Sequence, residues 1–430
     1  MIDETVRDEV RRVAESARAA SSALGQTTAG ERNRALIAMA RALRERAADI
    51  IAANGRDMDA AREAGTKESL LDRLMLDESR VEAMACALED LVVLPDPLGC
   101  VQDERQLYNG IELTRVSVPL GVVAVVYEAR PNVTADAAGI CLKSGNAAVL
   151  RGGSLASASN EAVARVLHDA AVSAGMPQGC IGLIASTDRA AADELMQLHG
   201  VIDVLIPRGG AGLIRHCVEH SKVPVIETGT GNCHVYVHAT ADLEMARAIV
   251  LNAKCRRYGV CNAAETLLID EAAAEVMLPR LLADLQAKGV LLHADECALR
   301  VARAHGIKAE AAVEQDWATE YLAPEMAVKC VGGVDEAIDH VNRYGTRHSE
   351  AIVADPTDAE GAAALEAFLN RVDAAAVYAN ASTAFTDGGQ FGLGAEIGIS
   401  TQKLHARGPF ALAALTSYKY VLRGTGQVRA

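Results

Sequence analysis

The run of residues 121–127, GVVAVVY, is the feature that most narrows the folds open to this chain. A near-continuous apolar run of this length is typical of a β-strand that is buried on both faces. The segments after it are expected to alternate in the order helix 133–143, strand 147–150, helix 157–174, strand 181–184, helix 188–198, strand 203–206, helix 210–220 and strand 223–226. This alternation predicts an α/β fold with a doubly wound parallel sheet.

The same alternation begins again at residue 242 and predicts a second α/β domain. Its expected elements are helix 242–256, strand 265–269, helix 271–287, strands 289–292 and 326–331, helix 333–343, strand 349–354, helix 357–370 and strand 374–378. Ala- and Arg-rich segments with helical spacing precede the first domain, at 4–24, 31–54 and 70–94.

The tail carries an isolated strand at 416–422, TSYKYVL, which no helix follows. Such a strand often pairs with another chain or with an inserted hairpin, and we expect such a hairpin near 105–120. The predicted division is a cofactor domain over 1–240, a catalytic domain over 241–405, and an oligomerisation strand over 406–430 that returns to the cofactor domain. We therefore expect a homo-oligomer.

Composition excludes some classes of protein. The chain has 42 basic and 57 acidic residues and a net charge of −15, which disfavours general nucleic-acid binding. No stretch approaches the roughly 18 apolar residues of a membrane span. The ten cysteines are irregularly spaced, which indicates reduced thiols and a cytoplasmic protein, and no cluster has the spacing of a metal site.

Cys261 is the strongest candidate for a nucleophile. It lies in a turn between an expected helix and an expected strand, and Lys254, Arg256 and Arg257 lie just upstream. Positive charge favours the thiolate, which is the reactive form of cysteine. Free cysteines are also among the most buried residue types, so a purely structural role stays open at this point.

Two turns have the composition of phosphate-binding loops. Arg151-Gly152-Gly153 follows the strand 147–150, and Arg208-Gly209-Gly210 follows the strand 203–206. Each offers backbone N–H groups and a guanidinium before a helix, which suits a phosphate, so a nucleotide site is predicted. Gly229-Thr230-Gly231 runs into another strand instead of a helix and does not fit a dinucleotide fingerprint.

Five segments carry a resemblance to a known family: Tyr127–Leu150, Val223–Val237, Gly259–Leu268, Val334–Ile352 and Phe391–Tyr420. The chain resembles the aldehyde dehydrogenase superfamily and, within it, the γ-glutamyl phosphate reductase family. The resemblance implies an aldehyde-dehydrogenase-like fold. It also implies NADPH-dependent reduction of L-glutamyl 5-phosphate to L-glutamate 5-semialdehyde, with release of phosphate through a thioacyl-cysteine, in the second step of proline biosynthesis. Glutamate 5-kinase, which would supply this labile substrate, is an expected partner.

The resemblance also implies roles for individual residues. Cys261 is the expected nucleophile, and a backbone N–H of Cys261 or Asn262 is the expected oxyanion donor. The expected NADP contacts are Lys143, Arg151, Gly152, Gly153, Arg208, Gly209, Gly210 and Glu320. The expected substrate contacts are Arg256, Arg257, His234 and Asn380, although His234 by its sequence alone could equally be a core residue.

Two other functions stay open from the sequence. A hydrolytic aldehyde dehydrogenase would use Glu227 as a base and would need no phosphate. A non-catalytic nucleotide-binding protein would not need the thiol of Cys261. The chain departs from the family pattern at Cys255-Arg256-Arg257-Tyr258, where only Arg257 keeps its type, and at Glu128, which lies near the position of the dehydrogenase oxyanion asparagine.

Overall fold

The computed structural model describes residues 4–128 and 130–429 and consists of two compact units. Unit 1 is formed by Met1–Thr228, Gly392–Gly398 and Phe410–Ala430, and unit 2 by Gly229–Phe391 and Ile399–Pro409. The predicted α/β fold class is confirmed. The division falls earlier than the expected boundary at residue 240, because the strand β7 (Cys233–Val237) pairs with strands of the second sheet and so belongs to unit 2.

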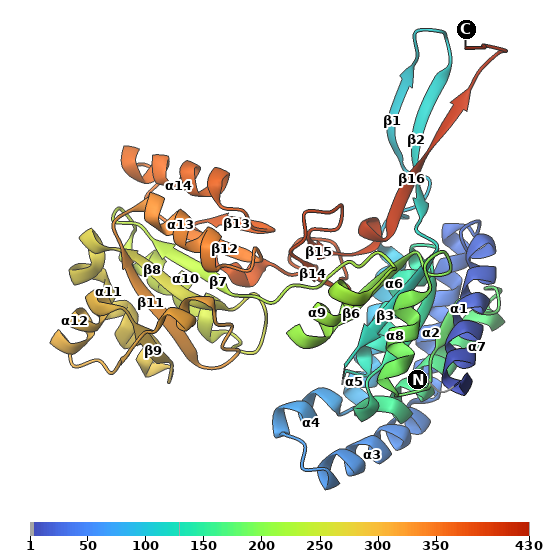
Figure 1. Cartoon of the computed structure of the whole chain (residues 1–430), viewed down its shortest axis with the longest axis horizontal. Helices are drawn as coiled ribbons and strands as arrows, with labels where there is room; N and C mark the ends of the chain where they lie inside the picture. The colour runs from blue at the N-terminus through green and yellow to red at the C-terminus, as the bar shows by residue number, and fades with distance from the viewer. Residues whose placement is uncertain (1–3, 129, 430) are drawn as a thin grey trace. The chain divides into compact units, whose positions relative to one another are not determined.

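Unit 1 is built on a parallel sheet of four strands in the order β5-β4-β3-β6, of which Figure 1 labels β3 and β6. The central strand β3 is buried at every residue, as its apolar sequence predicts. The strands are β3 (Val122–Tyr127), β4 (Ala147–Gly152), β5 (Ile181–Leu183) and β6 (Val204–Arg208). The expected strand at 223–226 is wrong, since in the described chain this segment makes only an isolated bridge between Val225 and Leu205.

Two groups of helices pack around this sheet. In one group, α8 contacts both α1 and α9. In the other group, α2, α3 and α5 pack against the pair formed by α6 and α7. The helices are α1 (Glu4–Leu24), α2 (Ala29–Glu45), α3 (Ala47–Glu63), α4 (Glu68–Leu74), α5 (Glu78–Val93), α6 (Asn132–Lys143), α7 (Ser157–Ser173), α8 (Arg189–Gln197) and α9 (Ala211–His220). The single helix expected over 31–54 is instead α2 and α3, because Arg46 leaves helical geometry with φ −107° and ψ 16°.

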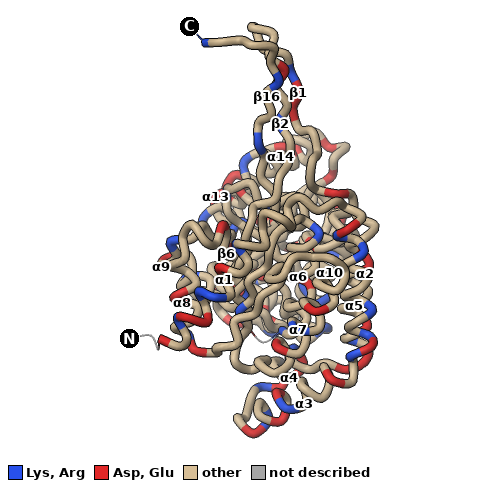
Figure 2. Tube along the Cα trace, turned by 90° about the vertical axis from the view of Figure 1, so that its right-hand side faces the viewer, with Lys and Arg blue, Asp and Glu red and all other residues tan. Residues whose placement is uncertain are grey.

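Charged residues of both signs alternate along the outer helices of unit 1, as Figure 2 shows for α2, α5 and α8. Arg44 of α2 forms ion pairs with both Glu82 and Glu89 of α5, so one guanidinium links two carboxylates across this pair of helices. Among the described residues, no helix combines the length and the apolar character that a membrane crossing requires.

The expected inserted hairpin and terminal strand form one antiparallel sheet in the order β1-β2-β16. The strands are β1 (Val101–Gln106), β2 (Glu112–Pro119) and β16 (Thr416–Arg423), and they extend from the rest of unit 1 as a ribbon (Figure 1). β16 therefore pairs with the hairpin of its own chain, and its other edge carries no strand among the described residues.

Unit 2 contains a parallel sheet of seven strands in the order β10-β9-β11-β8-β7-β12-β13. The strands are β7 (Cys233–Val237), β8 (Ala264–Asp270), β9 (Leu291–Ala294), β10 (Glu310–Ala311), β11 (Glu325–Val331), β12 (Ser349–Val353) and β13 (Ala376–Ala379). The helices are α10 (Leu243–Cys255), α11 (Glu271–Ala287), α12 (Glu296–Ala304), α13 (Val334–Tyr344) and α14 (Ala359–Arg371). Two short strands, β14 (Gly398–Ser400) and β15 (Gly408–Phe410), pair with each other.

Each face of the seven-stranded sheet carries its own apolar core, because successive side chains of a strand point to opposite faces. Val235 and Val237 of β7 join the core formed with α10, α11 and α12, whereas Tyr236 joins the core formed with α13 and α14. Apolar residues follow one another along β7 and β8 because both faces of these strands are covered.

Buried histidines lie beside the second of these cores. His340 of α13 contacts the rings of Trp317 and His234, and it is 5% exposed. Burial lowers the pKa of His340 to about 3, and the positive charges of Lys329 and Arg343 act in the same direction. His340 is therefore neutral in the folded chain at every pH above about 3, while an unfolded histidine binds a proton below about pH 6.5.

This difference in pKa predicts that His340 lowers the free energy of unfolding in acid. The unfolded state binds the proton as pH falls below about 6.5, so the free energy of unfolding should fall by about 2 kcal/mol between pH 7 and pH 5 on account of this residue. Urea unfolding of His340→Gln at both pH values should show a pH-dependent change smaller by that amount than in the unchanged chain. Equal pH dependence in the two proteins would refute the assignment.

Candidate active site

Cys261 lies in the turn between α10 and β8, half-buried in unit 2. The helix ends at Cys255 with Arg256 as its cap, and the chain then passes through Tyr258 and Gly259 before it enters the sheet. β8 pairs with β7 on one side and β11 on the other, so the turn is attached to the central part of the sheet. The expected placement of Cys261 between a helix and a strand is confirmed.

The backbone carbonyl of Cys261 is enclosed by its neighbours. The thiol of Cys233, the first residue of β7, donates to this oxygen at 3.1 Å. Gly231 is packed so closely that a Cβ atom there would lie 1.5 Å from the same oxygen. Only glycine fits at this position, which explains the second glycine of Gly229-Thr230-Gly231 without any nucleotide site.

Asn262 anchors the other side of the turn. Its side-chain NH₂ donates to the backbone carbonyls of Ala384 and Thr386, at 3.3 and 3.0 Å. Its backbone carbonyl accepts from the Thr383 hydroxyl at 2.8 Å. The Asn262 amide group is thus occupied in holding the turn. Only the backbone N–H of this residue is left as its contribution to an oxyanion site.

The three cations upstream of Cys261 have different surroundings. Lys254 is fully buried and forms an ion pair with Glu265, whose carboxylate also accepts from the backbone N–H of Leu322. Burial raises the pKa of Glu265 to about 7, and the lysine opposes this shift. Lys254 is therefore a partner of Glu265 within the core, whereas Arg256 and Arg257 are exposed.

Glu265 reaches Lys254 because the β7–β8 register shifts between Cys233 and His234. Ala264 lies opposite Cys233 and Thr266 lies opposite His234, so Glu265 is the extra residue of a bulge. A bulge redirects a side chain locally. Nothing in the sequence pattern of 264–270 signals this shift, and the role of Glu265 was missed for that reason.

Glu320 lies beside the Cys261 turn. Its carboxylate accepts from the backbone N–H of Gly231 at 2.6 Å, and burial raises its pKa. The structure therefore brings Glu320 and Cys261 together through Gly231. The expected contact of Glu320 with a cofactor ribose stays a prediction.

Two expected substrate contacts have structural partners instead. His234 is fully buried, donates its backbone N–H to Glu350 and has its Nδ1 atom 3.0 Å from the same carboxylate. Burial lowers the pKa of His234 to about 3. Asn380 has a φ of 55°, and its side chain forms two hydrogen bonds with the backbone of Ala354. The geometry does not support either residue as a substrate ligand.

The two Arg-Gly-Gly loops of unit 1 lie at one edge of its sheet. β4 and β6 flank β3 in parallel, so their carboxyl ends lie on the same side. Arg151 donates to the carbonyls of Thr187 and Asp188, at 2.8 and 2.9 Å. These contacts fix the guanidinium beside the start of α8.

Each loop is tightly packed around its glycines. A Cβ atom on Gly152 would lie 2.0 Å from the Asn160 side chain, and one on Gly209 would lie 2.7 Å from the Glu128 carboxyl group. The Glu128 carboxylate accepts from the backbone N–H of Gly210 at 2.8 Å, at the N-terminus of α9. Glu128 thus caps this helix, a role that its sequence position did not suggest.

Lys143 does not lie at this edge. It is the last residue of α6, before the strand β4 begins, and so lies at the amino end of that strand. It is 1% exposed, and its Nζ atom donates to Asn33 Oδ1 at 2.8 Å and to the Val92 carbonyl at 3.2 Å. The prediction of Lys143 as a cofactor contact is wrong, because its ammonium group binds the N-terminal helical arm at the opposite end of β4.

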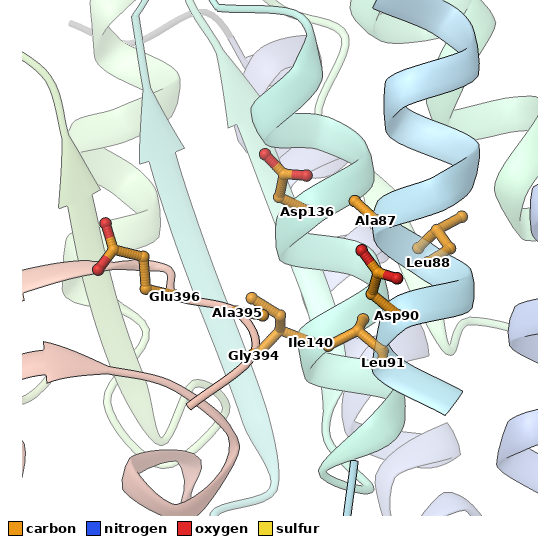
Figure 3. A pocket seen from close by; sticks show the side chains of 9 residues that line it. All are labelled: Ala87, Leu88, Asp90, Leu91, Asp136, Ile140, Gly394, Ala395 and Glu396. Atoms are coloured by element: carbon orange, nitrogen blue, oxygen red, sulfur yellow. The ribbon is translucent and has the colours of Figure 1, made fainter. Parts of the chain in front are cut away.

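A hollow in unit 1 lies between α5, α6 and the segment 394–396. Figure 3 shows the carboxylates of Asp90, Asp136 and Glu396 around it. Burial raises the pKa of Asp136 to about 6, while Asn132 and Arg208 act in the opposite direction. No residue of the predicted site is among those that line this hollow in the described chain.

Comparisons with known proteins agree with this architecture. The model of the aldehyde dehydrogenase family matches residues 2–296, so the chain belongs to the aldehyde dehydrogenase family. The chain is 55% identical to the γ-glutamyl phosphate reductase of Moorella thermoacetica, over 98% of this chain and 99% of the relative. It is 43% identical to a crystal structure of the same enzyme from Thermotoga maritima, with a TM-score of 0.95 over 98% of this chain and 100% of that one. Within the larger family it is a member of the γ-glutamyl phosphate reductases, as the resemblance implied.

A more distant structure shows the fold alone. An acetylating aldehyde dehydrogenase from Geobacillus thermoglucosidasius is 23% identical, with a TM-score of 0.68 over 99% of this chain and 98% of that one. The family model and the closely similar relatives, by contrast, make the chain an oxidoreductase of the aldehyde dehydrogenase family.

The contact at Gly231 predicts that adding one methyl group there lowers the stability of the chain strongly. Gly231→Ala forces the Cys261 carbonyl to move, and we expect a loss of about 3 kcal/mol in unfolding free energy. Gly332→Ala is the matched control in unit 2, since a Cβ atom there meets only Glu336 at 3.5 Å. Urea unfolding of both variants measures this, and equal stability of the two would contradict the packing described.

Proposed function

We propose that this chain reduces L-glutamyl 5-phosphate to L-glutamate 5-semialdehyde with NADPH and releases phosphate. The observation that carries the proposal is the Cys261 turn, which presents a half-buried thiol from a rigidly held backbone. Relatives that are named γ-glutamyl phosphate reductase support the choice of substrate. The reaction provides the glutamate-to-semialdehyde step of proline biosynthesis.

The thiolate of Cys261 attacks the acyl carbon of the substrate in the proposed mechanism. A tetrahedral oxyanion forms, the bond to the phosphate oxygen breaks, and a thioacyl enzyme results. The acyl phosphate already has a good leaving group, so charge stabilisation by a backbone N–H at Cys261 or Asn262 matters more than a strong general acid. The thiohemiacetal formed after reduction then collapses to aldehyde and free thiol.

Arg256 and Arg257 are the proposed contacts of the leaving phosphate. Both are exposed and follow directly after α10, in the same turn as Cys261. An exposed guanidinium can bind a phosphate in a bidentate manner. Lys254 cannot do so while its ammonium group is buried against Glu265.

The loops at the carboxyl edge of the unit 1 sheet are the proposed cofactor site. They combine tightly packed glycines, the guanidiniums of Arg151 and Arg208, and the N-terminus of α9. A cation here fits the 2′-phosphate of NADPH, which supplies the hydride when bound. Glu320 is the proposed contact of its nicotinamide ribose.

A homo-oligomer is also part of the proposal. The β1-β2-β16 ribbon exposes Tyr418, Tyr420 and Leu422 along a strand edge that carries no partner strand in the described chain. An exposed apolar edge of this kind favours pairing with another copy. In the cytoplasm, an association with glutamate 5-kinase would shorten the exposure of the labile acyl phosphate to water.

If the ribbon is the interface between copies of the chain, disrupting it should lower the mass of the particle in solution. Tyr418→Lys combined with Leu422→Lys should dissociate the oligomer, because it places charge on the exposed edge strand. Size-exclusion chromatography with light scattering measures the mass, and Val276→Lys is a matched control at an apolar residue that is 73% exposed on α11. An unchanged mass of the double variant would argue against this interface.

The thioacyl mechanism predicts that the reaction requires both Cys261 and phosphate. Cys261→Ala should lower the rate of NADP⁺ reduction by the semialdehyde on the order of 10³-fold or more, because no nucleophile remains. Cys255→Ala is the matched control, a second thiol at the end of α10, and should keep most of the activity. The reaction should stop without phosphate. Turnover without phosphate would favour a hydrolytic dehydrogenase that uses Glu227.

A further inference from the structure

The thiol of Cys233 lies against the backbone of the Cys261 turn. Cys233 is fully buried at the start of β7, and its sulfur lies 3.1 Å from the carbonyl oxygen of Cys261. Burial raises the pKa of Cys233 well above its usual range, with the charges of Glu350 and Cys261 in the same direction. The group therefore stays a thiol and can donate a hydrogen bond, and a second nucleophile at this position is not favoured.

The imidazole of His348 does not change this assignment. Its Nδ1 atom lies 3.8 Å from the Cys233 sulfur but only 2.7 Å from the Ser349 hydroxyl, which is the closer partner. Burial lowers the pKa of His348 to about 4, so it carries no charge that would favour a thiolate. The proton of Cys233 is left for the Cys261 carbonyl.

The carbonyl that Cys233 binds belongs to the same planar unit as the N–H of Asn262. In a trans peptide these two groups point in opposite directions, so fixing the oxygen fixes the direction of the N–H. Gly231 closes the space on the oxygen side, and the Asn262 side chain is bound to Ala384 and Thr386. The whole peptide unit is therefore held from both sides.

We propose that Cys233 is a positioning residue: its thiol orients the Cys261–Asn262 peptide so that the Asn262 N–H meets the oxyanion of the acyl group bound to Cys261. This inference rests on the proposed function, since it assigns the orientation of the donor in that reaction. Preorganised donors of this kind stabilise the transition state without reorganisation. Loss of the thiol leaves the nucleophile in place but removes the hydrogen bond to the Cys261 carbonyl, so the direction of the Asn262 N–H is less closely fixed.

Three variants separate positioning from a merely structural role. Cys233→Ala removes the donor, Cys233→Ser restores a donor of similar size, and Cys330→Ala removes a buried thiol elsewhere in unit 2, on β11. The measurements are kcat and KM for phosphate-dependent oxidation of the semialdehyde with NADP⁺, and the rate of Cys261 alkylation by iodoacetamide. Alkylation needs the nucleophile but no oxyanion donor.

We expect kcat of Cys233→Ala to fall about tenfold, a part of the loss seen when an oxyanion donor is removed entirely. KM and the alkylation rate should stay within about twofold of the unchanged chain, since binding and the nucleophile itself do not depend on this donor. Cys233→Ser should recover most of kcat, and Cys330→Ala should not lower it.

Two results would overturn the inference. One is a kcat for Cys233→Ala within twofold of the unchanged chain. The other is a parallel loss of kcat and alkylation rate in the Ala and Ser variants alike, which would mean that the turn itself has collapsed. An unchanged chain without phosphate-dependent activity would instead overturn the proposed function, so the two failures are distinguishable.

Discussion

The contact between Gly231 and the carbonyl of Cys261 is the constraint on which the candidate site depends. It brings the segment before β7 against the turn before β8 with no space for a side chain. The same glycine donates its N–H to Glu320, so one residue ties the Cys261 turn to the proposed ribose contact. Cys233 and Asn262 complete the enclosure, and the thiol of Cys261 is presented from a backbone that has little freedom to move. Close packing of this kind is how a loop attains the precision of a regular element.

Charge around the turn is divided between the core and the surface. Lys254 and Glu265 neutralise each other where both are shielded from water, and removing either would leave a buried charge without a partner. Arg256 and Arg257 stay at the surface, where an anionic substrate can reach them. Residues 254–257 thus combine one partner of a structural ion pair with a candidate phosphate site. The exposed arginines account for how a chain of net charge −15 could bind an anion.

The sequence was sufficient for the parts of the fold that follow from periodicity. The buried strand at 122–127 and the alternation after it predict the two parallel sheets, since continuous apolar runs need cover on both faces. The break at Arg46 in the helix expected over 31–54 was not predictable, because it depends on backbone geometry and not on a proline or glycine. The expected strand at 223–226 shows the opposite failure: its apolar sequence suits a strand, but it makes only one bridge.

Candidate site residues could be named from the sequence where a family motif or a turn marks them, as at Cys261 and the two Arg-Gly-Gly loops, and their roles stay predictions. They were missed or misassigned where tertiary contacts decide. Lys143 has the charge of a cofactor ligand but ends the helix α6 at the amino end of β4, and His234 has a carboxylate partner that is distant in sequence. Cys233 could have been noticed as a small residue two positions after Gly231, yet only the structure shows that it donates to the backbone carbonyl of Cys261.

The most direct measurement of the central claim is the mass of the enzyme after reaction with L-glutamate 5-semialdehyde and NADP⁺ in the absence of phosphate. Without phosphate as acceptor, the account predicts a γ-glutamyl thioester that accumulates on the peptide containing Cys261 and disappears when phosphate is added. An enzyme that reduces NADP⁺ repeatedly under these conditions, with no adduct on Cys261, would contradict it.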